Sequence, residues 1–343
     1  MNKTQVPNMR IPYAELHEVL QRILVDTGFE SDRAELCARL FADASRDGVP
    51  SHGVNRFPRF IETIKNGVVD IQATPALISS RGALEQWDGQ HGAGNLNAHA
   101  SMRRAISLAR AQGIGCVALR NTNHWMRGGN YGWQAADASV IGICWTNTMP
   151  NLPAWGASDP RLGNNPLVIA VPRSKGHVVL DMAMSQFSYG TLETYRTRRE
   201  QLPVIGGFDL AGELTCDPAA IEASHRPLPI GFWKGSGLAI MMDLVASLLA
   251  RGSATHEIAP EVLKETNLSQ VFVAFDVPGD DFTDALADRI IESITTSTPT
   301  GEDRVRYPGE RTLAFRAENM EKGIPVDSSV WEQVLAMCQN RER

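Results

Sequence analysis

The spacing of apolar residues predicts three helices at the start of the chain. Apolar side chains recur three or four positions apart in residues 13–27, 31–48 and 52–67. This spacing places them on one face of a helix in each segment. Ser51 is suited to cap the third helix, whose first residue would be His52. The side chains predicted to face the core are Leu16, Val19, Leu20, Ile23, Leu24, Leu36, Leu40, Phe41, Phe57, Phe60, Ile61 and Ile64. The polar residues 1–10 indicate a disordered leader.

Beyond these helices, runs of β-branched and apolar residues alternate with helical spacing. Strands are predicted at residues 85–89, 115–119, 141–146, 167–171, 177–180 and 270–276, and helices at 97–112, 133–138, 235–251 and 282–294, with two more helices at the C-terminus. Pro172 and a polar turn separate two of the strands and indicate a hairpin. Because the strand runs are continuously apolar, we expect helices to cover a central sheet.

Two further expectations concern the last third of the chain. In the helix at residues 235–251, the side chains expected to pack inward are Leu238, Met241, Met242, Val245 and Leu248. The segments at residues 206–229 and 252–270 are rich in loop-forming residues and are predicted to run over the surface.

Composition and charge narrow the class of protein. The chain has 343 residues, 43% of them hydrophobic and 21% charged, which fits a globular protein of two or more structural units. A formal net charge of −6 argues against a nucleic-acid or anionic-membrane surface. The apolar window at residues 231–250 contains Lys234 and Asp243 and is too polar for a membrane span. No signal peptide is evident, and the five cysteines are scattered without a Cys-x-x-Cys pair, so we expect a cytoplasmic protein with free thiols.

Several common functional motifs are missing from the sequence. No Gly-x-Gly-x-x-Gly sequence follows a predicted strand, so a standard Rossmann fingerprint is absent. No phosphate-binding Walker loop and no Gly-x-Ser-x-Gly elbow are found. The eight histidines lack the paired spacing of zinc ligands, so no metal site is predicted.

The stretch at residues 50–60 carries the most suggestive chemistry. On a helix that begins at His52, the imidazole would share one face with Arg56, four residues on, near the positive end of the helix dipole. Positive neighbours favour neutral imidazole, so the pKa of His52 should be low until an anionic ligand binds. This suits an acid or base acting on a substrate with a carboxylate. The alternative is an ordinary amphipathic helix with a surface histidine and two arginines.

Three other positions have both a functional and a structural interpretation. His124 lies in a glycine-containing loop after a predicted strand, where it could line a pocket or could be a core histidine. Lys234, just before a predicted helix and flanked by glycines, could bind a phosphate, although the glycines could serve only the turn. Asp181 could accept hydrogen bonds from a ribose, could orient a histidine, or could cap a helix from Met184 onward.

Taken together, these segments resemble one known family. They are Ser51-His52-Gly53-Val54-Asn55-Arg56, Asn123-His124-Trp125-Met126-Arg127-Gly128-Gly129, Trp155-Gly156, Gly163-Asn164-Asn165-Pro166, Asp181-Met182-Ala183, Phe187-Ser188-Tyr189-Gly190, Trp233-Lys234-Gly235-Ser236-Gly237 and Pro308-Gly309-Glu310. In this order they are similar to the malate/L-lactate dehydrogenase family of the non-Rossmann type, from about residue 11 to the C-terminus. A match in several ordered motifs is far more specific than any one of them.

The resemblance implies an α/β fold in which N-terminal helices accompany a mixed central sheet, and a homodimer that uses NADH or NADPH. Residues 1–75 would carry the catalytic histidine, residues 76–120 and 235–343 would form a substrate and dimerisation core, and residues 121–234 would bind the cofactor. The implied catalytic residues are Ser51, His52, Arg56 and His124. The implied cofactor-binding residues are His177, Val178, Val179, Leu180, Asp181, Met182, Ala183, Trp233, Lys234, Gly309, Glu310 and Arg311.

Two departures from the family pattern stand out. Gly163-Asn164-Asn165-Pro166 replaces the usual Gly-Thr-Asn-Pro. Pro308-Gly309-Glu310-Arg311 replaces a Pro-Gly-His-Glu sequence, and its additional arginine could favour the extra phosphate of NADPH.

The mechanism that we hypothesise is reduction of a small-molecule 2-oxo sugar acid. NAD(P)H would deliver a hydride to C2, His52 would donate the proton, and Arg56 would anchor the carboxylate. His124 is the competing candidate for the proton donor. The alternatives are reduction of another 2-oxo acid or a cyclic imino acid, of the malate, lactate or ureidoglycolate type, and a non-catalytic protein that binds sugar acids.

Overall fold

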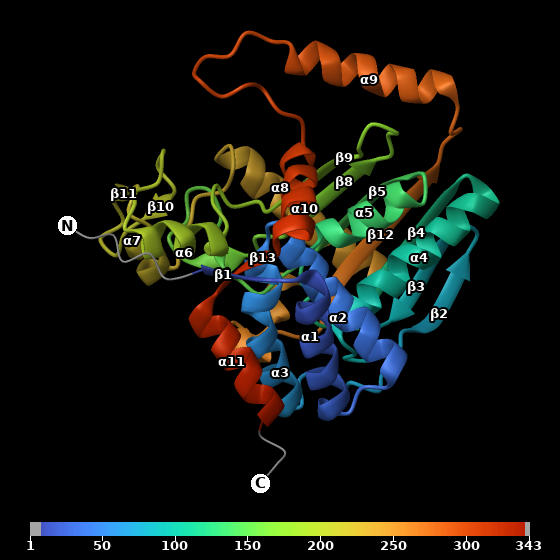
Figure 1. Cartoon of the computed structure of the whole chain (residues 1–343), viewed down its shortest axis with the longest axis horizontal. Helices are drawn as coiled ribbons and strands as arrows, with labels where there is room; N and C mark the ends of the chain where they lie inside the picture. Colours follow the sequence, from blue (N-terminus) through green and yellow to red (C-terminus); the bar gives the residue numbers. More distant parts are fainter. Residues whose placement is uncertain (1–7, 340–343) are drawn as a thin grey trace.

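A seven-stranded sheet forms the centre of the computed structural model, which describes residues 8–339 (Figure 1). In spatial order its strands are β2 (Ala76–Arg81), β3 (Leu84–Asp88), β4 (Ile114–Thr122), β12 (Leu268–Asp276), β5 (Val140–Thr146), β8 (Leu167–Val171) and β9 (Val178–Met182). Strands β3 and β4 pair in parallel, and every other pair in this sheet is antiparallel. The predicted mixed sheet and the hairpin at Pro172 are therefore confirmed.

Helices cover both faces of the sheet because successive strand residues point to opposite sides. Cys144 of β5 packs in the core beneath α4 (Gly94–Gln112) and α5 (Gly129–Asp137). Its neighbour Trp145 packs in the cluster beneath α8 (Trp233–Ala250) and donates a hydrogen bond from Nε1 to the carbonyl of Met242 at 3.1 Å. The long parallel connection from β3 to β4 runs through α4, as a crossover requires.

The orientation of α8 differs from the prediction. The helix turns small residues toward the sheet, and its buried positions are Gly235, Ser236, Ala239, Met242, Ala246 and Ala250. Of the side chains predicted to pack inward, Met242 is buried, whereas Leu238, Met241 and Leu248 are 40%, 54% and 73% exposed. Because α8 is apolar almost all round, its periodicity could not show which side meets the sheet. Among the described helices, α8 alone has the length and composition of a membrane span, but one side of it packs on β12, β4 and β5.

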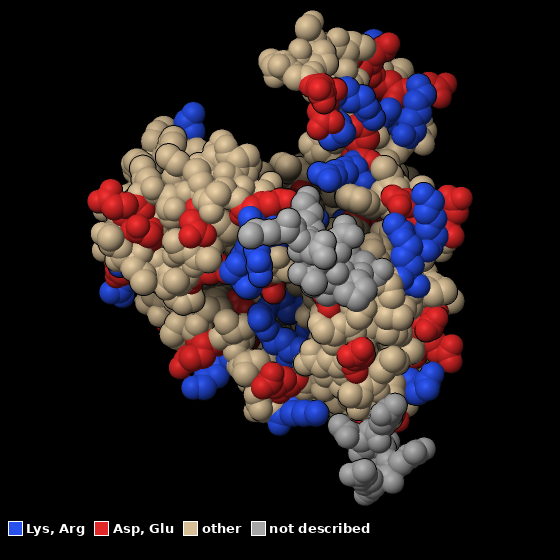
Figure 2. Space-filling model, turned by 60° about the vertical axis from the view of Figure 1, so that its left-hand side comes forward, with Lys and Arg blue, Asp and Glu red and all other residues tan. Residues whose placement is uncertain are grey.

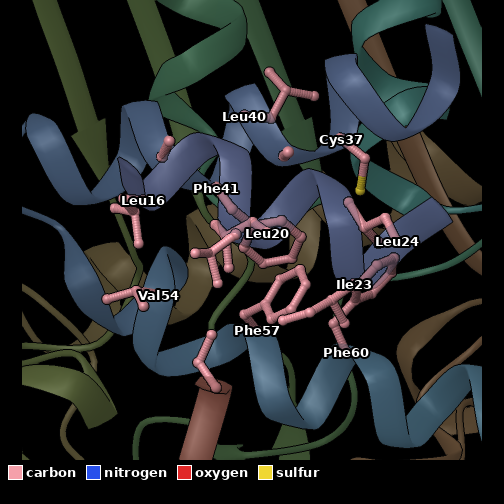
Figure 3. Close-up of a cluster of buried hydrophobic side chains, with 14 of the residues drawn as sticks. Leu16, Leu20, Ile23, Leu24, Cys37, Leu40, Phe41, Val54, Phe57 and Phe60 are labelled. Carbon is pink, nitrogen blue, oxygen red and sulfur yellow. The ribbon is translucent and has the colours of Figure 1, made fainter. Parts of the chain in front are cut away.

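A second hydrophobic core lies among the N-terminal helices (Figure 3). Helices α1 (Tyr13–Thr27) and α2 (Ser31–Arg46), both predicted as helices, pack together, and α3 (Phe57–Lys65) and α11 (Ser328–Gln339) join them. The Phe41 ring is 5.2 Å from that of Phe57 and 5.3 Å from that of Phe60, measured between centroids. These edge and tilted contacts fix α3, which follows the 50–56 segment, against α2.

The expected leader is partly structured. Residues 1–7 lie outside the described residues, but the next four form β1 (Asn8–Ile11). This strand pairs antiparallel with β13 (Ile324–Asp327), so the prediction of disorder is wrong for residues 8–10. The strand was difficult to predict from the sequence because it has only four residues and its partner strand is far away in the chain.

The third helix begins later than predicted. Two short 3-10 turns, Pro50–His52 and Val54–Arg56, precede α3, which starts at Phe57. Pro58 explains this start. In a helix running from His52, the ring of Pro58 would lie against the carbonyl of Val54, and because proline has no backbone N–H that carbonyl would receive no hydrogen bond. In the first turn of α3 the proline costs no hydrogen bond. His52 and Arg56 therefore do not share the face of one α-helix.

The remaining elements lie around the sheet. They include α6 (Tyr189–Arg198), α7 (Pro218–Ser224), α9 (Asp281–Thr295), α10 (Glu310–Lys322), the 3-10 turns Thr255–Glu257 and Val262–Lys264, and the short hairpins of β6 (Leu152–Pro153) with β7 (Pro160–Leu162) and β10 (Gly207–Phe208) with β11 (Leu214–Thr215). The segment at residues 206–229, expected to be loop, thus contains a helix and a hairpin. Figure 1 shows α9 standing away from the body. The three-part domain division stays a prediction.

Candidate active site

Two histidines from distant segments meet beside the connection from β4 to α5. His52 ends the first 3-10 turn, and His124 lies in the loop between β4 and α5. Their rings are stacked, with centroids 5.8 Å apart and planes inclined by 19°. The structure therefore brings together the two candidate proton donors.

The orientation of His124 is fixed by its own loop. Its Nδ1 accepts a hydrogen bond from the backbone N–H of Met126 at 3.0 Å, so in the neutral ring the proton resides on Nε2. Met126 has a φ of +63°, and the neighbouring Trp125 ring packs on Tyr131 and Phe272 in the main core. A rigid loop thus presents an N–H donor rather than a freely rotating imidazole.

His52 lies in a positive environment. The Ser51 hydroxyl is 3.1 Å from Nδ1 of His52, so Ser51 contacts the imidazole instead of capping a helix. Burial lowers the pKa of His52 to about 3, and the nearby charges of Arg56, Arg127 and Arg59 act in the same direction. Burial also lowers the pKa of His124 well below its usual value. Both rings are therefore neutral at physiological pH in the absence of an anion.

A pocket beside these rings carries the charges that an acidic substrate needs. Its polar lining comes from Arg56, Arg59, Thr63, Asn123, His124 and Glu265. Burial and the neighbouring Arg59 lower the pKa of Arg56 to about 10, still far above neutrality. On the face shown in Figure 2, Lys and Arg side chains gather around a hollow. The arrangement is suited to bind a carboxylate next to the imidazole of His124, on which His52 stacks.

Asn123 offers a further acceptor at this pocket. Its Nδ2 donates to the carbonyls of His91 and Gly92 at 2.7 and 2.9 Å, which fixes the side chain. The Oδ1 atom is buried and has no hydrogen-bond partner among the described residues. A buried acceptor without a donor is costly, so a bound group that donates a hydrogen bond would stabilise it.

One buried carboxylate, which the sequence analysis missed, joins three parts of this region. Asp47, at the end of α2, accepts hydrogen bonds from Arg46 at 2.8 Å, from Arg127 at 2.7 Å and from two nitrogens of Arg316 at 2.9 and 2.7 Å. These arginines hold the pKa of Asp47 far below its usual range, against the opposing effect of burial. An acidic residue at the C-terminus of a helix interacts unfavourably with the helix dipole. This unfavourable position was the feature of the sequence that could have indicated a special role for Asp47.

Asp181 has a role that none of the sequence interpretations described. It is in β9, and its Oδ2 accepts a hydrogen bond at 2.9 Å from the backbone N–H of Gly129, the first residue of α5. No helix begins at Met184, because the next helix starts at Tyr189 and is capped by Ser188, so the capping prediction is wrong. Partial removal of the carboxylate from water raises the pKa of Asp181, and the charge of Arg127 opposes this effect.

Two of the predicted cofactor segments lie side by side. The sheet edge β9 contains Val178, Val179, Leu180, Asp181 and Met182, with His177 before it and Ala183 after it. The N–H of Val179 donates to the carbonyl of Pro308 at 3.0 Å. Gly309 has a φ of +94°, and a Cβ there would lie 3.0 Å from the nitrogen of Val179, so only glycine fits this approach.

Glu310 and Arg311 open helix α10 directly after that glycine. One carboxylate oxygen of Glu310 pairs with Arg304 at 2.9 Å, and the other, Oε2, is buried without a partner among the described residues. The guanidinium of Arg311 lies 5.3 Å from the centroid of the Phe315 ring. A free acceptor beside a helix N-terminus and an open strand edge fits the ribose and phosphate groups of a dinucleotide.

Trp233 and Lys234 lie further along the same edge. The N–H of Ile230 donates to the carbonyl of Met184 at 2.8 Å, which places the start of α8 near the end of β9. Trp233 is 66% exposed, and Lys234 is exposed and makes no ion pair with any described residue. His177 is engaged elsewhere, with its Nε2 3.1 Å from Asp137. No metal-binding group of histidine, cysteine or acidic residues occurs in residues 8–339.

Comparison with known proteins gives this geometry a context. A family model described as malate/L-lactate dehydrogenase matches residues 11–335. The chain is 46% identical over 333 residues to the 2,3-diketo-L-gulonate reductase of Escherichia coli (strain SE11), a match that covers 96% of this chain and 100% of that relative. The chain belongs to the malate/L-lactate dehydrogenase family. Because members carry the names of dehydrogenases and reductases, it is an oxidoreductase.

Solved structures in this family share the fold. The malate dehydrogenase of Pyrococcus horikoshii OT3 superposes with a TM-score of 0.88 at 27% identity, over 99% of this chain and 98% of that chain. The delta1-piperideine-2-carboxylate reductase of Pseudomonas syringae pvar. tomato gives a TM-score of 0.83 at 27% identity, over 96% and 99%. The predicted fold class and family are confirmed.

The Asp47 cluster generates the first prediction. Asp47→Asn should lower the free energy of unfolding at neutral pH by about 3–5 kcal/mol, because the buried guanidinium of Arg127 loses its hydrogen-bonded carboxylate and keeps only Asp181 at 3.9 Å. The pKa of Asp47 is depressed in the folded state, so its contribution is complete above the unfolded pKa of about 4 and is lost as the pH falls below it.

Urea denaturation of the wild type and the variant from pH 7 down to pH 3 measures this difference. The difference in the free energy of unfolding between the wild type and the variant should decrease only below about pH 4. Asp159→Asn, at an exposed aspartate that pairs with Arg161, is the matched control and should change stability by less than about 0.5 kcal/mol. An equal effect of both variants would contradict the interpretation.

Proposed function

We propose that this protein is an NAD(P)H-dependent reductase of a 2-oxo sugar acid, with 2,3-diketo-L-gulonate reduced to 3-dehydro-L-gulonate as the reaction. The observation that carries the proposal is the stacked pair of neutral histidines, His52 and His124, beside Arg56. The 46% identity to 2,3-diketo-L-gulonate reductase supports the choice of substrate. The structural likeness to an imino acid reductase makes a cyclic imino acid, or another 2-oxo acid, the second candidate.

In the proposed reaction, different residues of the site bind the substrate and transfer the proton. A bound reduced nicotinamide would supply the hydride. Arg56 holds the substrate carboxylate, and this negative charge offsets the arginines that depress the pKa of His52. The pKa of His52 therefore rises on binding, so the ring takes up a proton from water and, as the imidazolium, donates it to the C2 oxygen as charge develops there. The Nε2–H of His124 donates a hydrogen bond to the same oxygen.

We propose that the cofactor occupies the edge formed by residues 177–183, Trp233, Lys234 and residues 309–311, and that it is NADH. Trp233 would cover the cofactor, and the ammonium of Lys234 and the start of α10 would meet its phosphates. The unpartnered Oε2 of Glu310 suits a ribose hydroxyl and would repel an additional phosphate. Arg311, which the sequence suggested for that phosphate, instead lies over Phe315.

We also propose that the active protein is a homodimer of the cytoplasm, built through the outer face of α8. Leu238, Met241, Leu244 and Leu248 give this helix an exposed apolar stripe of the kind that marks an interface. A second copy would bury the stripe around a two-fold axis. The five cysteines are all free thiols in the structure, which suits a reducing compartment.

The function is tested by cofactor oxidation with a panel of 2-oxo acids. The wild type should consume NADH with 2,3-diketo-L-gulonate faster than with pyruvate or oxaloacetate. His52→Gln should lower kcat by about a hundredfold or more, the usual contribution of a general acid. His124→Gln should lower it by about tenfold, because a single hydrogen bond is lost. Thermal unfolding of both variants controls for misfolding.

Other results would redirect the proposal. A hundredfold loss in His124→Gln with near-normal turnover in His52→Gln would make His124 the proton donor. Turnover restricted to another 2-oxo acid or an imino acid would withdraw the named substrate. No cofactor oxidation with any of these compounds would favour a sugar-acid binding protein.

The cofactor assignment makes a separate prediction. The wild type should have a higher kcat/KM with NADH than with NADPH, and Glu310→Gln should reduce this ratio about tenfold because the repulsion of the extra phosphate is removed. Arg311→Gln is the control and should leave the ratio unchanged. A loss of activity with NADPH in Arg311→Gln would show instead that this arginine binds the additional phosphate of NADPH.

The proposed dimer is tested by molar mass in solution. Light scattering should give twice the mass of the chain for the wild type, and Met241→Glu should give a monomer because the interface cannot bury an unpaired charge. Val25→Glu, at a half-exposed position on α1, is the matched control and should stay dimeric. A dimeric Met241→Glu protein would place the interface elsewhere.

A further inference from the structure

One acidic side chain lies in the otherwise basic pocket of the candidate site. Glu265 follows the 3-10 turn Val262–Lys264 and shares the pocket lining with Arg56 and Arg59. It lies in the segment predicted to be surface loop, and no local pattern in the sequence indicated it. The packing of this segment against α3 brings it to the site.

The carboxyl group of Glu265 is held in place by one hydrogen bond, which involves only one of its two oxygens. Its Oε1 accepts a hydrogen bond from the backbone N–H of Met149 at 3.1 Å. In the described part of the chain, no hydrogen bond reaches Oε2 and neither Arg56 nor Arg59 is within ion-pair distance. The pocket thus holds two cations and a separate acceptor that is not paired with either of them.

Glu265 is a half-buried charge that lines the pocket. Its partial removal from water raises its pKa, while the hydrogen bond from Met149 and the charges of Arg56 and Arg59 act in the opposite direction. A carboxylate held in a pocket with one unused oxygen is stabilised by a ligand that donates hydrogen bonds to it. It is destabilised by a ligand that brings a second negative charge.

We propose that Glu265 determines substrate specificity by accepting hydrogen bonds from the hydroxyl groups of a polyhydroxy 2-oxo acid and by disfavouring dicarboxylates. The inference rests on the proposed function for the reacting end of the substrate, whose carboxylate Arg56 binds. The hydroxyl-bearing carbons beyond C3 would then extend toward Glu265. A dicarboxylate such as oxaloacetate would place its second charge near the same carboxylate.

The variant Glu265→Gln separates charge from shape. Glutamine keeps an oxygen that can accept the Met149 N–H, so the fold should be retained. The ratio of kcat/KM for 2,3-diketo-L-gulonate to that for oxaloacetate should fall at least about tenfold, equivalent to about 1.4 kcal/mol. Glu265→Asp retains the charge and should continue to exclude oxaloacetate. Glu261→Gln, at an exposed glutamate outside the pocket, removes the same charge and should leave the ratio unchanged.

A binding measurement makes the inference independent of turnover. With the protein saturated with NADH, calorimetry would compare L-gulonate, a polyhydroxy acid, with L-malate, a dicarboxylate, neither of which NADH can reduce. The wild type should prefer L-gulonate, and Glu265→Gln should shift the ratio of Kd values at least about tenfold toward L-malate.

The outcomes distinguish this inference from the proposed function. Turnover by the wild type with unchanged ratios in Glu265→Gln would overturn the role of Glu265 and leave the function intact. No turnover of any 2-oxo acid by the wild type would overturn the function, and the Kd ratios would then decide the role of Glu265. An equal shift in Glu261→Gln would show a general charge effect and would overturn the inference.

Discussion

The contact between Asp47 and three arginines is the interaction on which the rest of the site depends. The carboxylate is almost completely buried, and it joins the end of α2, the loop that carries His124 and the helix α10. Arg316 also lies over the Trp133 ring of α5, at 4.3 Å from its centroid. Three segments that are distant in sequence therefore share one charge. If any of them moves, a buried guanidinium or carboxylate loses its partner, which is costly.

Arg56 and Arg59 place an excess of positive charge close to His52 and His124, and Arg127 of the Asp47 cluster adds to it at His52. Burial is the main cause that keeps the imidazoles neutral, and this excess acts in the same direction and prepares the pocket for an anion, so ligand charge and proton affinity are coupled. Glu265 limits the same excess at another part of the pocket. The site therefore combines a strong preference for one carboxylate with a local penalty for a second.

Local sequence patterns predicted the elements well where a single face decided the outcome. Helix α1 has the predicted bounds because Leu16, Leu20 and Leu24 fix its buried side and Gly28 ends it in a left-handed conformation. The patterns failed where two faces were apolar, as in α8, and where one residue overrode the spacing, as Pro58 does at α3. The structure brings together His52, Arg56 and His124, which the motifs had named, and their catalytic roles stay a prediction. Asp47 and Glu265 could not be found in this way, because their partners come from distant parts of the chain.

The pairing of β1 with β13 has a consequence for how the chain reaches its structure. Asn8 lies opposite Asp327, so the first described strand has no partner until almost the whole chain has been synthesised. Arg316, which completes the cluster at Asp47, also comes late. The N-terminal helices can form their own core early, but on the ribosome the carboxylate at the end of α2 must wait for its last arginine. Contacts that span such sequence distances slow folding, so the region around Asp47 and the candidate site should be the last part to become rigid.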